Sequence, residues 1–283
     1  MKPDDFDLFA VLVKQRSGLV LTRDKAYLLE SRLTPVARKW NMKTLDDLAQ
    51  SIRARREEAM LRDITEAMTT NESFFFRDQK PFDQFRQILL PEFLKSRAAK
   101  KQIRIWSAAA SSGQEAYSLA MILSEEAIKF RDWKIEIIGT DLSSEMVERA
   151  KSGIYSQFEV QRGLPITMLV KYFQQIGADK WQIKENIRQM VQFREGNLLT
   201  DFGPVGVFDI IFCRNVLIYF DQPTKTRVLE ALATILAPDG VLYLGGAETV
   251  LGITEKFRPK ENERGLYVLN SKPSAPARQV VGS

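Results

Sequence analysis

Two carboxylates follow short apolar segments of the kind that form buried strands. Glu115 comes at the end of the small-residue segment Ser107–Glu115, in the first turn of an expected helix, and Asp141 ends the next apolar run. In an open α/β sheet, ligands bind in the crevice at the carboxyl ends of the strands. Glu115 can cap its helix or hold a cationic amine. Asp141 can begin a helix or accept hydrogen bonds from ribose hydroxyls, and its place at a strand end favours the ribose.

The Ser107–Glu115 segment holds a single glycine, Gly113. Its small side chains let a ligand approach the backbone, and the next helix offers free N–H groups. A dinucleotide fingerprint needs three glycines to admit a pyrophosphate, so a ligand without phosphates fits better than NAD. The alternative is a small-residue turn kept short for packing.

Further polar side chains follow the apolar run Phe208–Cys213. Arg214 and Asn215 come directly after it and are expected to face the same crevice, with Tyr219 one helical turn later. Tyr219 alone is as readily explained as a half-buried core aromatic. Thr69–Arg77 places three adjacent phenylalanines among polar residues, which suits either a lid over a ligand or a hydrophobic hinge between domains.

The composition excludes several kinds of chemistry. The chain has no histidine and one cysteine, which rules out imidazole bases, HExxH zinc sites, zinc–thiolate clusters and internal disulfides. A net charge of +5 over 283 residues is weak evidence for nucleic acid, and we expect no such partner. No apolar run reaches the ~20 residues of a membrane span, and Met1–Asp7 lacks the order of a signal peptide. A cytoplasmic protein without membrane insertion is expected.

The spacing of apolar residues divides the chain into two parts. Residues 1 to about 70 have helical spacing, with a break or kink expected at Thr34-Pro35. After a linker helix interrupted by Pro91, alternating strands and helices predict a doubly wound α/β domain with a mostly parallel sheet. Residues 151–190 fit no simple crossover and predict an inserted subdomain. The expected strands are Ile103–Trp106, Ile135–Ile138, Val207–Phe212 and Val241–Leu244, and the expected helices are about Gln114–Phe130 and Ser144–Ala150, the latter capped by Ser143.

These segments, in this order, resemble the chemotaxis receptor methyltransferase family (CheR). The resemblance covers nearly the whole chain, to about residue 270. In one departure, the family's Gly-Glu-Glu-Pro core reads Gly113-Gln114-Glu115-Ala116 here, which keeps the second acid. The most specific parts are Thr70–Arg77, Trp106–Met121, Gly139–Asp141 and Phe212–Asp221.

The resemblance implies a class I S-adenosylmethionine-dependent methyltransferase fold with a small all-helical, receptor-facing domain at 1–77. The methyltransferase domain would span 78–270, with a three-stranded antiparallel β insert at about 165–195. The tail at 271–283 is rich in Pro, Ser and Ala, and this composition predicts disorder. The implied cofactor is S-adenosylmethionine, with S-adenosylhomocysteine as its product and no metal. The side chains implied to line the cofactor site are Asn71, Ser73, Arg77, Glu115, Asp141, Asn197, Leu198, Arg214 and Asn215.

The implied reaction esterifies glutamate side chains on the cytoplasmic helical domain of chemotaxis receptors, for sensory adaptation. Methyl transfer from a sulfonium to an ionised carboxylate needs orientation and desolvation rather than a base, so a chain without histidine can catalyse it. Arg77 and Tyr219 are the catalytic candidates implied nearest the transferred methyl. Each can hold the incoming carboxylate by a hydrogen bond.

The basic segment Ser51–Arg56 is a candidate receptor-binding surface. Arg53 and Arg56 are expected on one helix face with Arg55 beside them, where receptor glutamates would meet them favourably. A solvated basic face is the alternative. The turn Ile176–Trp181 is shorter and poorer in glycine than in family members that dock on a receptor pentapeptide, so we predict activity independent of that pentapeptide. A monomer is expected.

Three other functions stay open from the sequence. A methyltransferase acting on nucleic acid or a small molecule is allowed by the mild basicity, although the Asn/Asp-Pro-Pro-aromatic motif of base methylation is absent. A non-catalytic module that senses the cofactor is disfavoured by Arg77 and Tyr219. A nicotinamide-dependent dehydrogenase is disfavoured by the single glycine in Ser107–Glu115.

Overall fold

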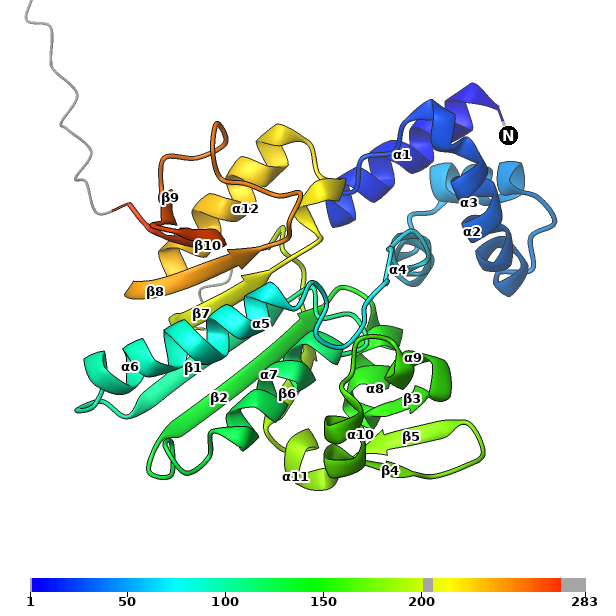
Figure 1. The fold of residues 1–283 in the computed structure, drawn as a ribbon. Helices are drawn as coiled ribbons and strands as arrows, with labels where there is room; N and C mark the ends of the chain where they lie inside the picture. Colours follow the sequence, from blue (N-terminus) through cyan, green and yellow to red (C-terminus); the bar gives the residue numbers. More distant parts are fainter. Residues whose placement is uncertain (1, 201–205, 271–283) are drawn as a thin grey trace, which may run out of the picture.

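A helical domain lies beside a larger α/β domain in the computed structural model, which describes residues 2–200 and 206–270 (Figure 1). The amphipathic helices of the first domain bury one face each around a small core that includes Phe9, Leu29, Leu48 and Ile64. Its elements are α1(Pro3–Ser17), the 3₁₀ turn η1(Arg23–Lys25), α2(Ala26–Lys39), α3(Leu45–Ala54) and α4(Glu58–Ala67).

A seven-stranded sheet forms the centre of the larger domain. Its order is β6-β2-β1-β7-β8-β10-β9, with parallel neighbours from β6 to β8 and antiparallel neighbours from β8 to β9. The predicted doubly wound, mostly parallel fold is confirmed. The strands are β1(Gln102–Ala108), β2(Lys134–Asp141), β6(Val191–Glu195), β7(Phe208–Cys213), β8(Leu236–Leu244), β9(Phe257–Lys260) and β10(Glu263–Leu269).

Alternating strand residues fill two cores, one on each face of the sheet. Ile105 and Phe212 pack on the face covered by α5, α6 and α7, and Trp106 and Ile211 pack on the face covered by α12. Burial on both faces explains why the strands read as nearly continuous apolar runs. The helices around the sheet are α5(Lys80–Gln84), the π-helical turn η2(Phe85–Leu89), α6(Leu90–Ser96), α7(Gln114–Glu125), α8(Ser144–Ser152) and α12(Gln222–Ile235).

An antiparallel insert is present, but the predicted range of 165–195 is wrong at both ends. Its three-stranded sheet, in the order β3-β5-β4, begins at Ile154 and ends at Ile183. Val191–Glu195 is instead β6 of the large sheet, because Phe193 packs against Gly139 of β2. The elements of this region are β3(Ile154–Ser156), α9(Gln157–Gln161), α10(Ile166–Tyr172), β4(Phe173–Gln175), β5(Lys180–Ile183) and α11(Glu185–Arg188).

Two prolines act differently from the prediction. Pro35 lies inside α2, and the hydroxyl of Thr34 donates to the carbonyl of Glu30 within that helix, so no new helix begins there. Pro91 does not end its helix either. The chain widens into the π-helical turn η2 just before it, which carries the helix into α6.

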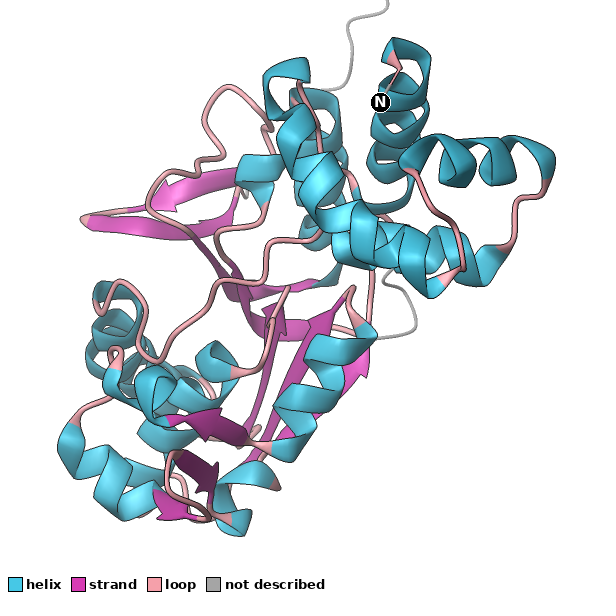
Figure 2. Cartoon of the chain, turned by 90° about the vertical axis from the view of Figure 1, so that its right-hand side faces the viewer, coloured by secondary structure: helices cyan, strands magenta, loops and turns pink. Residues whose placement is uncertain are grey.

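The helical domain lies at the edge where the parallel strands end (Figures 1 and 2). The core of the helical domain ends with Met68, whereas Phe75 is buried in the core of the large domain, so the change of domain falls before the predicted residue 77. Among the described residues, no helix is both long and apolar enough to cross a membrane. The predicted tail at 271–283 lies outside the described residues.

The insert packs against the domain connection at Gly163, which gives a test of this arrangement. Gly163 has φ = 81°, and a Cβ there would overlap the carbonyl oxygen of Phe75. Gly163→Ala should therefore lower the free energy of unfolding by about 2 kcal/mol or more. Thermal or denaturant unfolding measures this. Gly246→Ala is the matched control, because a Cβ at Gly246 meets no atom within 4 Å. Equal stability of the two variants would contradict the packing described.

Candidate active site

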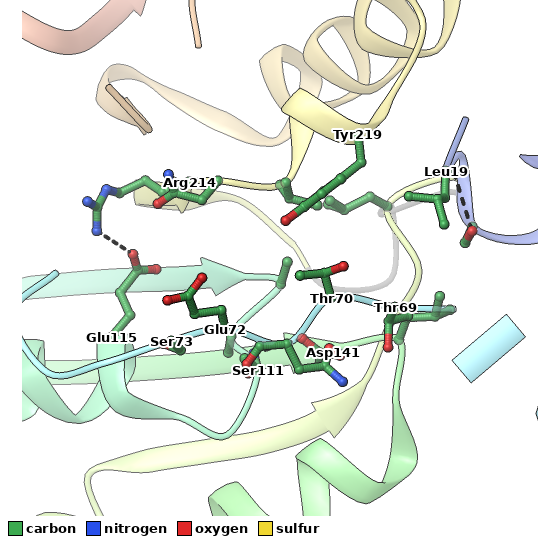
Figure 3. A pocket seen from close by; sticks show the side chains of 18 of the residues that line it. Leu19, Thr69, Thr70, Glu72, Ser73, Ser111, Glu115, Asp141, Arg214 and Tyr219 are labelled. Carbon is green, nitrogen blue, oxygen red and sulfur yellow. Dashed lines mark hydrogen bonds and ion pairs between the residues drawn. The ribbon is translucent and has the colours of Figure 1, made fainter. Parts of the chain in front are cut away.

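A pocket lies at the carboxyl ends of β1, β2 and β7, with the helical domain along one side (Figure 3). It encloses about 980 Å³, its open mouth included, which suits a nucleoside joined to an amino acid. All the predicted cofactor residues line it, together with Tyr219. These residues are Asn71, Ser73, Arg77, Glu115, Asp141, Asn197, Leu198, Arg214 and Asn215.

Asp141 is buried at the end of β2, where two backbone N–H groups donate to its carboxylate. Ser111 N lies 2.7 Å from Oδ2, and Ser143 N lies 3.0 Å from Oδ1. Burial raises the pKa of Asp141, and these hydrogen bonds oppose the rise. Ser143, not Asp141, caps α8 by accepting from Met146 N. Because each carboxylate oxygen has two lone pairs, Asp141 can still accept hydrogen bonds from a ligand.

Arg214 is buried at the end of β7 and joins three segments. Its Nη1 pairs with Glu115 Oε2 at 2.9 Å, and its Nη2 pairs with Asp78 Oδ2 at 2.8 Å and donates to Arg77 O at 2.9 Å. Glu115 Oε1 also accepts from the hydroxyl of Ser107 at 2.8 Å. Figure 3 shows the Arg214–Glu115 pair at one end of the pocket.

This ion-pair group fits the two charged ends of an amino acid. Two carboxylates around one guanidinium leave a net negative charge, which favours an ammonium beside Glu115. The buried Arg214 Nε meets no hydrogen-bond acceptor among the described residues, so it can donate to a ligand carboxylate. Glu115 is not a simple helix cap, because its carboxylate accepts hydrogen bonds from Ser107 and Arg214.

Arg77 is held by the segment that carries it. Its neighbours Phe76 and Asp78 have φ values of 52° and 65°, left-handed conformations that non-glycine residues adopt only where surrounding contacts impose them. The Arg77 side chain donates from Nη1 to Glu72 O at 2.8 Å, and its guanidinium lies 5.6 Å from the centre of the Phe74 ring. These contacts keep Arg77 half-buried at the pocket wall.

Sequence reasoning missed Arg162, which fastens the same segment from the insert. Its Nη2 pairs with Glu72 Oε1 at 2.6 Å, and its guanidinium lies 4.3 Å from the centre of the Phe74 ring. Phe75 is fully buried behind it. The Thr69–Arg77 segment is therefore both a wall of the pocket and an anchored connection between the domains.

Glu248 was also missed, and it holds the turn that carries Tyr219. Its carboxylate accepts from the backbone N–H groups of Asn215 at 2.8 Å, Val216 at 2.9 Å and Ile218 at 3.2 Å. Figure 3 shows the phenol of Tyr219 directed into the pocket from this turn. Tyr219 is half-buried, as the core interpretation expected, yet it lines the pocket as well.

The helical domain contacts the same turn directly. Val20 N donates to Tyr219 O at 2.9 Å, and Lys14 Nζ pairs with Asp221 Oδ2 at 2.7 Å. The hydrogen bond from Lys14 lowers the pKa of Asp221 to about 2. These contacts join the end of α1 and the residues after it to the start of α12.

Two further contacts join the helical domain to the other wall of the pocket. Glu66 of α4 accepts from Ser144 N at 3.1 Å, at the start of α8 and close to Asp141. The Asn197 side chain donates to Arg16 O at 2.7 Å. Asn197 thus lines the pocket as predicted, but its amide nitrogen is engaged by the helical domain.

The predicted basic face at Ser51–Arg56 differs from the expectation. α3 ends at Ala54, so Arg55 and Arg56 lie beyond the helix and Arg53 shares no helix face with Arg56. Arg53 is also paired with the buried carboxylate of Asp5 at 2.6 Å, which offsets its charge.

Among the described residues, no cluster of three or more side chains is suited to hold a metal ion.

The order of the strands, the pocket at their carboxyl ends and the family comparison together define the class. Residues 71–266 match the family described as CheR methyltransferase, SAM binding domain, and residues 4–69 match CheR methyltransferase, all-alpha domain. The protein is an S-adenosylmethionine-dependent methyltransferase. More specifically, the chain belongs to the CheR methyltransferase family.

Similar proteins agree with this membership. The chain is 37% identical to chemotaxis protein methyltransferase Cher2 of Pseudomonas putida, over 93% of this chain and 96% of the relative. It is 40% identical to chemotaxis protein methyltransferase 1 of Pseudomonas aeruginosa, over 93% and 96%. It is also 40% identical to the chemotaxis protein methyltransferase of Vibrio anguillarum, over 88% and 90%. The predicted family is thus confirmed.

The raised pKa of Asp141 gives a pH test of the predicted hydrogen bonds between Asp141 and the cofactor ribose. Ionised Asp141 accepts hydrogen bonds, and its proton is lost at a higher pH than that of an ordinary aspartate. Affinity for S-adenosylhomocysteine should therefore fall on going from about pH 7.5 to about pH 5, where an ordinary aspartate stays ionised. Calorimetric titration measures this.

Asp141→Asn is the matched variant for that experiment. It should bind more weakly at neutral pH, by about tenfold or more, because a charged acceptor is lost. Its affinity should also vary less with pH than that of the wild type. A wild-type affinity that is unchanged across the range would contradict the role given to Asp141.

Proposed function

We propose that this enzyme transfers a methyl group from S-adenosylmethionine to glutamate side-chain carboxylates of chemotaxis receptors, forming methyl esters for sensory adaptation. The single observation that carries the proposal is the position of Arg77 and Tyr219, which line the same pocket as Asp141 and Glu115. The similar proteins are named chemotaxis protein methyltransferases, which supports the choice of substrate.

In this proposal the cofactor lies across the ends of the strands. Asp141 accepts hydrogen bonds from its ribose, Glu115 pairs with its ammonium, and Arg214 Nε donates to its carboxylate. Asn71, Ser73, Asn197, Leu198 and Asn215 complete the walls. Bound S-adenosylmethionine would supply a methyl group on a positively charged sulfur. An ionised carboxylate would attack the methyl carbon in line, so that an O–C bond forms as the S–C bond breaks and the sulfur leaves as the neutral thioether of S-adenosylhomocysteine.

The chain's own part in the reaction is orientation and exclusion of water. Arg77 holds the incoming glutamate carboxylate by a charge-assisted hydrogen bond, and the Tyr219 phenol donates a second one. Interactions that are too strong would stabilise the ground state of the bound carboxylate as much as the transition state. These groups therefore orient the carboxylate rather than neutralise it. Orientation of two reactants can supply effective molarities of about 10⁵ M or more. No proton is transferred, and no metal is needed.

The proposed partner is the cytoplasmic helical domain of chemotaxis receptors, met by the enzyme as a cytoplasmic monomer without nucleic acid or membrane insertion. The receptor-binding roles of Arg53, Arg55 and Arg56 stay predictions. The ion pair between Arg53 and Asp5 makes Arg55 and Arg56 the freer cations of the three.

The proposed roles of Arg77 and Tyr219 are tested by substitution. Arg77→Ala and Tyr219→Phe should each lower kcat by about tenfold or more, because each removes a hydrogen bond that orients the carboxylate. Their Kd for S-adenosylhomocysteine should change less than kcat. The assay measures base-labile transfer of tritiated methyl to chemoreceptor-containing membranes, and Arg131→Ala, an exposed arginine outside the pocket, is the control.

The same assay tests the reaction itself. Label on nucleic acid, or label on receptors that resists base, would contradict ester formation. Cofactor binding without turnover would instead support a sensor module. Normal rates in both variants would make the assigned roles of Arg77 and Tyr219 wrong.

Independence from a receptor pentapeptide is the second test of this proposal. β4 and β5 are joined by only the residues 176–179, a short turn with one glycine. A receptor-tail pentapeptide should therefore show no measurable heat of binding in calorimetry at micromolar protein. Receptors with and without this tail should be methylated at equal rates. Tight binding of the peptide would overturn the prediction.

A further inference from the structure

The guanidinium of Arg77 rests on two neighbours in its own segment. Its Nη1 donates to Glu72 O at 2.8 Å, and the guanidinium lies 5.6 Å from the centre of the Phe74 ring. The backbone of Arg77 is held separately, because its carbonyl accepts from Arg214 Nη2 at 2.9 Å. The direction of the Arg77 guanidinium therefore depends on where Glu72 and Phe74 lie.

Arg162 of the insert, which directly follows α9, contacts both of these neighbours. Its Nη2 pairs with Glu72 Oε1 at 2.6 Å, and its guanidinium lies 4.3 Å from the centre of the Phe74 ring. The hydrogen bond from Arg162 lowers the pKa of Glu72, so this carboxylate stays ionised and attracted to its partner. A planar guanidinium can pair with a carboxylate and lie over an aromatic ring at the same time. The Arg162 side chain thus holds both groups that support Arg77.

The insert is anchored to the same segment by a second, buried contact. The fully buried ring of Phe75 makes edge-to-face contacts with Tyr155 of β3 and Phe173 of β4, at 5.0 Å and 5.5 Å between ring centres. Arg162, in contrast, is exposed. Removal of the Arg162 side chain should therefore leave the insert packed on Phe75, and such a variant should fold.

The contact made by Arg162 matters more for the reaction rate than for stability. The side chains of Arg162 and Glu72 are 42% and 55% exposed, and ion pairs between exposed side chains contribute little to stability. Glu72 and Arg77 both line the pocket, however, and Figure 3 shows Glu72 beside Ser73 at the pocket wall. In an active site, a misplacement of about 1 Å can lower the rate by about a hundredfold.

We propose that Arg162 is a positioning residue for methyl transfer, which holds Glu72 and Phe74 so that the Arg77 guanidinium faces the incoming carboxylate. Arg162 is not among the described residues that line the pocket, so it acts through Arg77 rather than on the cofactor or the substrate. This inference rests on the proposed function, because that proposal assigns Arg77 the orientation of the carboxylate.

Substitution with and without Arg77 tests the proposal, in the assay of tritiated methyl transfer to chemoreceptor-containing membranes. Arg162→Ala should lower kcat by about fivefold, with the Kd for S-adenosylhomocysteine within about twofold. In the Arg77→Ala background the same change should lower kcat by less than about twofold, because Arg77 is no longer there to be positioned.

Arg149→Ala is the matched control, and it should keep the wild-type kcat. Arg149 of α8 also holds α9 of the insert by a surface ion pair, to Glu159 at 3.0 Å, and its side chain is 44% exposed. The control thus removes an arginine of similar exposure that holds the insert elsewhere than at Glu72 and Phe74.

Nuclear magnetic resonance provides a second measurement that does not depend on turnover. The Nε–Hε signal of Arg77 can be assigned by its loss in Arg77→Lys. Its order parameter should be lower by about 0.2 or more in Arg162→Ala than in the wild type, because the guanidinium is then less restrained. Arg149→Ala should match the wild type. Equal order parameters in all three proteins would overturn the proposal.

The two proposals fail differently in these experiments. If the wild type forms no base-labile ester on receptors, the proposed function fails, and the order parameter still decides whether Arg162 holds the Arg77 side chain. If the ester forms and Arg77→Ala is slow, but Arg162→Ala matches Arg149→Ala, this inference is overturned and the proposed function stands. An equal loss from Arg162→Ala in both backgrounds also overturns it, because that loss would not act through Arg77.

Discussion

The buried guanidinium of Arg214 is the interaction on which the rest of the site depends. It is almost inaccessible to solvent, and a buried charge is tolerated only where partners compensate it. Its partners are Glu115 at the start of α7 and Asp78 together with the carbonyl of Arg77. Arg214 thus fixes the position of Glu115, which is proposed to hold the amino-acid end of the cofactor. It also fixes the backbone of Arg77, whose side chain is proposed to orient the substrate. Removing one member of a buried ion pair leaves the charges of its partners uncompensated. These groups are therefore expected to act as a unit.

Around this centre, the helical domain forms part of the pocket wall through Ser17 and Leu19, and it is also a candidate receptor-facing module. It hydrogen-bonds the backbone of Tyr219 through Val20, and it bonds the start of α8, near Asp141, through Glu66. The helical domain therefore contacts both walls of the pocket. Since no base is needed for the proposed reaction, such positional contacts are the main means by which this chain can change the rate.

The sequence predicted the sheet and the pocket well because both follow from local patterns. Apolar runs followed by Glu115, Asp141 and Arg214 locate strand ends, and parallel strands bring those ends to one edge. Glu248 and Arg162 could not be found this way, since their importance comes from contacts with segments distant in the chain. The basic face at Arg53 and Arg56 was wrong for a related reason: the helix stops at Ala54, a boundary that local spacing does not define. The C-terminal end of the insert was misplaced because Val191–Glu195 joins the large sheet by parallel pairing with β2.

The central claim is that the strand ends hold the cofactor with its sulfur facing Arg77 and Tyr219. A crystal structure of the enzyme with S-adenosylhomocysteine tests it most directly. In that structure we expect the ribose hydroxyls within hydrogen-bond distance of Asp141 and the amino-acid end between Glu115 and Arg214. We expect the sulfur on the side of the pocket where Arg77 and Tyr219 lie. A ligand bound outside this pocket, or a sulfur remote from both side chains, would contradict it.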